Sequence, residues 1–172
     1  QDERQVDVLL NKQVADYDGK VLKFKDGEEL PTETVIWAAG VKAVPFAGQL
    51  GAPTDRAGRV EVDEFLRVKG HDDIFALGDC ASFIQDGRPL ATVAPVATQQ
   101  AVVFAKNFKR IMKGGRPALI SFHYKDIGAM ATISRGKAVV KMPGGSEWKG
   151  FIAWVMWMVV HLMRLAGFYT NI

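Results

Sequence analysis

The sequence predicts an α+β chain with short strands at its start, one amphipathic helix in its middle, and further strands and an apolar helix at its end. Three observations support this fold class. Apolar residues alternate with polar ones near the amino terminus, which is typical of half-buried strands. Between residues 94 and 113 they recur at helical spacing. After residue 128, two strand-like stretches precede the most apolar segment of the chain.

The composition is that of a folded protein with a sizeable core. Of the 172 residues, 48% are apolar and 24% are charged, which lies outside the range of disordered chains. This length suits one domain, or one domain with a small appendage. The formal net charge of +3 is too small to indicate an acidic partner by itself. The single cysteine, Cys80, excludes a disulfide or a Cys-x-x-Cys pair within the chain.

The amino-terminal region predicts a short antiparallel meander. Apolar residues alternate within 6–10 and recur within 21–24, and turn signals lie at 18–19 and 25–28. Residues 1–5 are charged or polar and contain neither an initiator methionine nor an apolar signal core. We therefore expect the chain to be cut from a longer protein.

Two apolar runs that end in glycine are the first candidates for a ligand site. Residues 34–40 and 72–79 each predict a buried strand, and these strands stop at Gly40 and Gly78. Glycine at such a point lets a flat or phosphorylated ligand touch the backbone. Asp79 then offers a carboxylate to ligand hydroxyl groups. A single Gly-Asp pair after a strand is more often only a turn, but the repeated design favours a ligand.

Residues 94–113 predict an amphipathic helix that ends at Gly114-Gly115. Pro95 suits its first turn, where a missing N–H costs nothing. The basic residues of the helix share one face: Lys106, Lys109, Arg110 and Lys113.

The end of the chain predicts two strands and a second helix. The strands are residues 129–134 and 137–142, joined by a hairpin turn at Arg135-Gly136. Residues 143–146 predict a linker, and residues 150–168 the helix.

The second helix predicts a membrane-surface element. Charged and polar residues interrupt it well short of the ~20 apolar residues that a bilayer span needs, so we expect it to lie in the plane of the membrane. Tryptophan and arginine can occupy the headgroup depth. The residues predicted for membrane association share one side of the helix: Trp154, Trp157, His161 and Arg164. A core or dimer-interface helix is the alternative, and both roles can coexist.

Five segments carry a resemblance to a known family. Residues 35–41 are similar to the return of the chain from the NADH domain to the FAD domain in flavoproteins with two dinucleotide-binding domains. Residues 74–81 are similar to their second FAD motif, whose aspartate contacts the ribityl chain. Residues 94–100, residues 124–133 and the apolar helix ending at Gly167-Phe168 narrow the match. Together they resemble type II NADH dehydrogenases over essentially the whole chain.

The resemblance implies an α+β fragment of an α/β flavoprotein: a partial FAD/NAD(P)-binding domain with a β-meander, then C-terminal strands and an amphipathic membrane-surface helix. Residues 1–40 would end the NADH-binding domain and supply the return strand. Residues 41–115 would form the C-terminal part of the FAD-binding domain, and residues 116–172 the strand hairpin and membrane-association helix. The sequence contains no G-x-G-x-x-G segment for nucleotide phosphates. We therefore expect the isolated chain to be inactive.

The resemblance also implies individual site residues. The cofactor-binding residues would be Gly40, Gly78, Asp79 and Ala97. The quinone-site residues would be Thr98, Gln99 and Gln100. Free N–H groups and a positive dipole end at a helix start favour an electron-rich reduced flavin ring. The common family form has glutamine where this chain has Pro95, which moves the predicted quinone contacts to the three later residues. Glutamines that merely face solvent are the alternative.

The implied parent enzyme transfers electrons from NADH through FAD to a quinone, without pumping protons. FAD and NAD would be its cofactors; a lipid surface and a second copy in a homodimer would be its partners, and no nucleic acid is expected. It would be peripheral, on the cytoplasmic face of a bacterial inner membrane. The sequence assigns no catalytic residue and no metal site. Two alternatives stay open: a non-catalytic membrane-association or dimerisation module, and a soluble flavin-dependent reductase.

Overall fold

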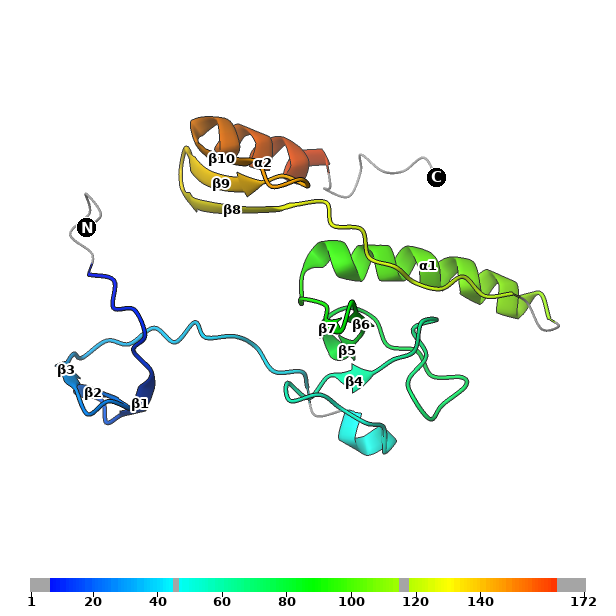
Figure 1. The fold of residues 1–172 in the computed structure, drawn as a ribbon, viewed down its shortest axis with the longest axis horizontal. Helices are drawn as coiled ribbons and strands as arrows, with labels where there is room; N and C mark the ends of the chain where they lie inside the picture. Colours follow the sequence, from blue (N-terminus) through cyan, green and yellow to red (C-terminus); the bar gives the residue numbers. More distant parts are fainter. Residues whose placement is uncertain (1–6, 45–46, 115–117, 164–172) are drawn as a thin grey trace. The chain divides into compact units, whose positions relative to one another are not determined.

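The computed structural model describes residues 7–44, 47–114 and 118–163, which belong to two compact units. The first unit ends at Val41 and the second begins at Lys42. Figure 1 labels the helices and strands of each. The mixed α and β composition predicted from the sequence is confirmed.

The first unit contains the predicted meander. Its strands are β1 (Val14–Tyr17), β2 (Val21–Phe24) and β3 (Glu29–Pro31), paired antiparallel in that order. The strand predicted at 6–10 is wrong in position. Val8, Leu9 and Leu10 are 72%, 55% and 76% exposed, and the described residues there lie outside any ladder. An alternating pattern cannot tell which of several stretches will find a neighbouring strand.

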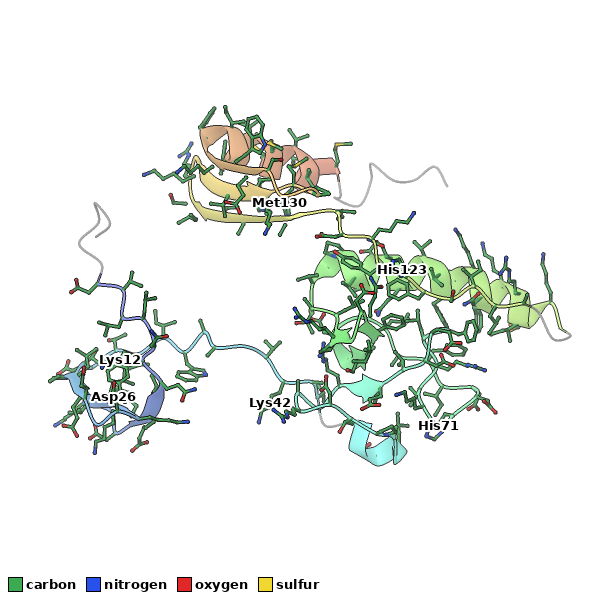
Figure 2. The ribbon with its side chains drawn as sticks, in the orientation of Figure 1. Lys12, Asp26, Lys42, His71, His123 and Met130 are labelled. Carbon is green, nitrogen blue, oxygen red and sulfur yellow. The ribbon has the colours of Figure 1, made fainter. Side chains whose placement is uncertain are left out.

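Polar contacts fix the turns of this meander. The Asp18 carboxylate accepts hydrogen bonds from the backbone N–H groups of Lys20 and Val21, at 2.9 and 2.8 Å. Lys12 and Asp26 point toward one another in Figure 2, and the Lys12 ammonium lies 2.6 Å from the Asp26 carboxylate. Hydrogen bonds to Asp26 and Glu28 raise the pKa of Lys12. The turn residues therefore hold the short strands in register.

The buried strand predicted at residues 34–40 is also wrong. The segment contains no helix or strand and pairs with no described residue, and Ile36 and Trp37 are 88% and 66% exposed. A strand needs a neighbouring backbone to bond its N–H and C=O groups. The apolar sequence alone does not supply that neighbour.

The second unit is built around a small core of short strands. Its elements are η1 (Ala47–Leu50), β4 (Val60–Glu61), η2 (Gly78–Cys80), β5 (Ala81–Ser82), β6 (Ile84–Gln85) and β7 (Arg88–Pro89). β4 and β5 pair parallel, and β6 and β7 form a hairpin. The buried residues of the core are Val60, Val62, Leu66, Val68, Ala76, Ala81, Phe83 and Phe122. The Phe83 and Phe122 rings meet edge to face, with centroids 5.0 Å apart.

The strand predicted at residues 72–79 is mostly irregular. Only Phe75 forms a bridge, with Arg67, and the chain then tightens into η2 at Gly78. Asp72 and Asp73 are exposed. A positive φ of 67° at Gly78 prevents the extended conformation from continuing.

Two similar turns flank this core. Asp55 accepts hydrogen bonds from the backbone N–H groups of Ala57 and Arg59, and its second oxygen accepts one from the Arg59 guanidinium at 2.7 Å. The Asp63 carboxylate makes the equivalent hydrogen bonds with Arg67, and it accepts from the Arg67 guanidinium nitrogen at 2.8 Å. Burial opposes ionisation of Asp55, but the hydrogen bonds from Arg59, Ser82 and Ala57 together outweigh it, so the pKa of this carboxyl is lowered.

The amphipathic helix is confirmed as α1 (Ala94–Met112). Its N-cap residue, Val93, is extended, and the helix ends near Gly114, which has a φ of 80°. Phe104 joins the helix to the core, because its ring lies 5.1 Å from that of Phe75. Lys109 and Arg110 lie in the last turn, where positive charge is favourable.

Residues 118–128, the strap, follow α1 and run beside it in the opposite direction (Figure 1). The described strap contains no strand; three carboxamide side chains bond its backbone instead. Each makes a clamp, in which the amide nitrogen donates to the carbonyl of one strap residue and the amide oxygen accepts from its N–H. The clamps are Asn107 on Ile120, Gln99 on Lys125, and Gln85 on Tyr124. Buried backbone groups are thereby satisfied without a sheet.

The carboxyl-terminal part forms an antiparallel sheet covered by a helix. The strands β8 (Ala129–Ser134), β9 (Lys137–Lys141) and β10 (Glu147–Gly150) lie in the order β10-β9-β8. The helix α2 (Phe151–Met163) packs on this sheet through Ala153, with Ala138 and Val140 buried beneath it.

The hairpin predicted for β8 and β9 is confirmed, but the predicted linker at 143–146 is not a linker. It is the turn of a second hairpin, closed by a hydrogen bond of 2.9 Å from the Met142 N–H to the Ser146 carbonyl. β10 follows it and was not predicted. The helix predicted to residue 168 is formed as far as Met163, and its remaining residues lie outside the described part.

Candidate functional site

The candidate site lies where η2 meets the start of α1. The Gly78 N–H donates a 2.7 Å hydrogen bond to the side-chain oxygen of Gln100. A Cβ atom at Gly78 would lie 3.2 Å from the Cβ of Ala97, which is tighter than ordinary van der Waals contact. The positive φ of Gly78 disfavours other residues as well. Glycine therefore allows η2 and α1 to approach closely, and the structure brings together Gly78, Ala97 and Gln100.

Asp79 follows within η2 and is exposed. None of the described hydrogen bonds or ion pairs uses its carboxylate. Ionised carboxylates accept hydrogen bonds strongly. Asp79 can therefore accept hydrogen bonds from the hydroxyl groups of a ligand that lies along η2. Cys80 is exposed, and its thiol lies 3.1 Å from the Leu77 carbonyl oxygen to which it donates.

The start of α1 presents the positive end of a helix. The Val93 carbonyl accepts from the N–H groups of Val96 and Ala97, at 3.0 and 3.4 Å. Pro95 has no N–H, and no acidic residue lies in the first turn. The positive end is therefore not offset by a carboxylate of that turn, which favours an anionic or electron-rich group beside it.

The three predicted quinone residues differ in their surroundings. Thr98 is exposed, and its hydroxyl donates to the Ala94 carbonyl at 2.9 Å. Gln99 is half-buried, and both ends of its amide bond the Lys125 backbone. Gln100 is 1% exposed. Solvent-facing glutamines, the alternative drawn from the sequence, are thus not found. Contact of these residues with a quinone stays a prediction.

The strap carries Tyr124 close to this region. Burial, and secondarily the negative charge of Asp126, raises the pKa of Tyr124 above its usual 10.0. Its phenol is therefore fully protonated at neutral pH. The sequence did not single out Tyr124 or the strap clamps, because the partners lie 26 to 39 residues away from Gln99 and Gln85.

Gly40, the fourth predicted cofactor residue, belongs to the first unit. It is exposed, has a φ of 83°, and a Cβ added there would meet no atom within 4 Å. Its conformation needs glycine, although the space around it does not.

The predicted membrane residues of α2 lie in different environments. Trp154 is half-buried and packs against the core of the C-terminal sheet. Trp157 stacks on His161, with ring centroids 4.1 Å apart, and His161 is exposed. Arg164 lies outside the described residues. The larger exposed apolar surface of α2 consists of residues not predicted: Phe151, Ile152, Val159, Leu162 and Met163. Ile152, Val159 and Met163 follow one another at seven and four residues, and this helical spacing was the signal that could have identified them.

The described residues contain neither a membrane-spanning helix nor a metal-binding cluster. None of the described helices is both long and apolar enough to cross a bilayer. Among the same residues, no three His, Cys, Asp or Glu side chains gather as metal ligands would.

Comparison with known proteins identifies similar sequences and a similar fold. Residues 1–101 match the family described as pyridine nucleotide-disulphide oxidoreductase. Two proteins of Mycobacterium tuberculosis, the type II NADH:quinone oxidoreductases NdhA and Ndh, are 42% and 38% identical to the chain over 97% of its length. The chain spans 37% of each of these relatives. The structure of NDH2 from Plasmodium falciparum in complex with NADH matches 89% of this chain and 46% of that one, with a TM-score of 0.73 and 18% identity.

Proposed function

The chain belongs to the pyridine nucleotide-disulphide oxidoreductase family, and from that premise we propose that it is part of an FAD-dependent NADH:quinone oxidoreductase. Its relatives of 42% and 38% identity carry that activity in their names. The chain covers 37% of their length, so the activity is proposed for the product of the complete reading frame that contains this sequence, called here the complete gene product.

The junction of η2 with α1 is the observation that carries this proposal. Gly78 lets the turn lie against Ala97, and the exposed Asp79 carboxylate stands on the same turn. Beside them the helix start offers positive potential. A ribityl chain rich in hydroxyl groups and an isoalloxazine ring that gains negative charge on reduction fit this donor and acceptor set. When bound, FAD would take a hydride from NADH and pass two electrons to a quinone.

The residues of this chain have separate tasks in that scheme. Asp79 accepts hydrogen bonds from hydroxyl groups of the cofactor. Gly40 has no side chain, so the backbone of the return segment can approach the cofactor closely. Ala97 borders the flavin. The quinone-side edge is formed by the first turns of α1, with Thr98, Gln99 and Gln100. The division into residues 1–40, 41–115 and 116–172 belongs to this proposal.

We further propose that α2 docks the protein on the cytoplasmic face of a bacterial inner membrane. Its exposed apolar side, including Ile152 at 59% and Val159 at 46% exposure, has no cover among the described residues. An in-plane helix with such a side gains by entering the boundary between headgroups and acyl chains. A quinone dissolved in the bilayer could then reach the protein without crossing water. A homodimer is part of the same proposal, since an exposed apolar side can also pack on a second copy.

Expression and purification of the complete gene product test the function. We expect about one flavin per chain by absorbance, and oxidation of NADH that depends on added quinone. A colourless protein that still binds liposomes would refute the enzyme and favour the non-catalytic membrane module. A flavin-containing protein that reduces soluble acceptors but no quinone would favour the soluble reductase.

A further inference from the structure

Gln99 and Gln100, neighbours in the first turns of α1, bond the backbones of two segments that are far apart in the sequence. Gln100 accepts the Gly78 N–H through its side-chain oxygen at 2.7 Å. Gln99 donates to the Lys125 carbonyl at 2.9 Å and accepts from the Lys125 N–H at 3.0 Å. These adjacent side chains thus tie η2 and the strap to the same helical turn.

We propose that Gln99 and Gln100 are positioning residues of the acceptor site: they hold η2 and the strap in place at the start of α1, and they affect the acceptor through these backbones. This rests on the proposed function and refines it. The first turns of α1 still form the quinone-side edge of the site. The side chains of Gln99 and Gln100 shape that edge through the backbones they hold and form no hydrogen bond to the quinone. Thr98, whose side chain is exposed, remains available for contact.

The strap depends mainly on side chains for its position. Its described residues lie outside any ladder, and a single described backbone hydrogen bond, from the Phe122 N–H to the Glu64 carbonyl at 2.7 Å, ties it to the rest of the unit. Asn107 and Gln85 clamp it at Ile120 and Tyr124. The Gln99 clamp on Lys125 is the one at the start of α1. Releasing it would free the strap after Tyr124, while the Gln85 clamp on Tyr124 and the Asn107 clamp, eight residues or about 12 Å along the helix, still hold.

The strap continues from Lys125 into the C-terminal sheet over a short distance. Asp126 accepts the Gly128 N–H at 2.8 Å, and β8 begins at the next residue. A Cβ at Gly128 would overlap the Lys141 carbonyl oxygen, so this point fits closely against β9. Only two residues separate the clamp on Lys125 from that fixed point. We expect a shift at Lys125 to reach Gly128, because only Asp126 and Ile127 lie between them.

The two glutamines use different side-chain atoms in these hydrogen bonds. The same substitution should therefore have different effects at the two positions. Gln100 is described only as an acceptor toward Gly78. Because this position is 1% exposed, a glutamic acid there would be protonated and would keep a carbonyl acceptor. Gln99 needs both its donor and its acceptor. A half-buried glutamate at 99 would place an oxygen against the Lys125 carbonyl, where the amide nitrogen now lies at 2.9 Å. Glutamate is therefore tolerated at 100 and harmful at 99.

The test compares Gln99→Glu, Gln99→Met, Gln100→Glu and Gln100→Met in the complete gene product. Hydrogen exchange of the Lys125 and Gly78 amides is followed together with kcat and KM for a short-chain quinone. We expect both Gln99 variants to speed exchange at Lys125 and to raise the quinone KM, each about tenfold. Gln100→Met should speed exchange at Gly78 and raise the quinone KM by similar factors, because it removes the acceptor of the Gly78 N–H. In Gln100→Glu, the exchange rate at Gly78 and the quinone KM should both stay within about threefold of the wild-type values.

Asn107→Asp is the matched control, because it breaks a clamp of the same chemistry farther along the strap. We expect it to lower the melting temperature and to leave the quinone KM unchanged. A raised KM in Gln99→Glu with normal exchange at Lys125 would show direct contact with quinone and overturn the proposal. A rise in the quinone KM that is as large in Gln100→Glu as in Gln100→Met would also overturn the proposal. A wild-type protein without quinone reductase activity would instead refute the proposed function, and the exchange rates alone would then decide whether the glutamines hold these segments.

Discussion

Gly78 combines a positive φ with a close neighbour, and the two effects can be separated. Gly78→Ala should lower the free energy of unfolding by roughly 1 to 3 kcal/mol, because it adds backbone strain and a contact with Ala97. Gly87→Ala is the control: Gly87 has a φ of 74° but open space around it. Urea denaturation of both variants measures the difference. Equal losses would show that the approach to Ala97 is not tight.

The Asp79 carboxylate takes part in no described hydrogen bond or ion pair, so its removal should affect the ligand more than the fold. In the complete gene product, Asp79→Ala should weaken FAD retention roughly ten- to a hundredfold, since charge-assisted hydrogen bonds contribute ~1.5 to 3 kcal/mol. Flavin absorbance after extensive dialysis measures this. Asp72→Ala, at another exposed position of the same unit, should retain the flavin. Normal retention in Asp79→Ala would refute its assignment as a cofactor residue.

Asp55 links stability to pH. Its folded-state pKa lies below the usual 3.8, so its contribution is complete above that pH and is lost as pH falls through the folded value. Asp55→Asn should lower the free energy of unfolding by about 1 to 3 kcal/mol at pH 7, because the Arg59 guanidinium loses its ionised partner. Urea denaturation at pH 7, 5 and 3 should show the two proteins converging at the lowest pH. A constant difference would contradict the role of ionised Asp55.

At the scale of elements, α2 has one side on its sheet and one side uncovered. Ile152→Ser with Val159→Ser should weaken binding to liposomes about thirtyfold, since losing half the burial energy of two such side chains is roughly 2 kcal/mol. The melting temperature should change little, because both residues are exposed. Trp154→Ser should do the reverse and lower the melting temperature, because Trp154 packs on the sheet core.

Flotation with neutral liposomes at high salt suits this comparison, because basic residues on α1 would add binding to anionic lipid. If the double variant floats as well as the wild type, α2 is not the docking element. Trp154 packs on the sheet core, and contact of Trp154 and Trp157 with a lipid surface stays a prediction.

The elements that the sequence predicts well are those whose signals are local. α1 shows its period within its own residues, and the hairpin of β8 and β9 shows its turn at Arg135-Gly136. Residues 34–40 and 72–79 have the composition of buried strands, but pairing depends on a neighbour that composition does not reveal. At the site, Gly78 and Gln100 could each be singled out. Their hydrogen bond could not, because 22 residues separate them.

At the scale of the whole molecule, the chain between the two units is exposed. Residues 33–44 contain no helix or strand, and Trp37 is 66% exposed. In the 172-residue chain, chymotrypsin should therefore cleave first after Trp37 and leave a stable product that begins at Ala38. Mass spectrometry of a short digestion identifies the first site. Cleavage within β8 to β10 before Trp37 would contradict this order.

The clamps of the strap also constrain the order in which the second unit can fold. Their loops close over 13, 26 and 39 residues, for Asn107, Gln99 and Gln85. The entropy cost of closure grows with loop length, and a threefold longer loop costs about 1 kcal/mol more. Two of the three carboxamides are carried by α1, so two of the three clamps can form only after that helix exists. We therefore expect the strap to dock first at Ile120 and then toward Tyr124, so that the acceptor edge is among the last parts of the unit to become ordered.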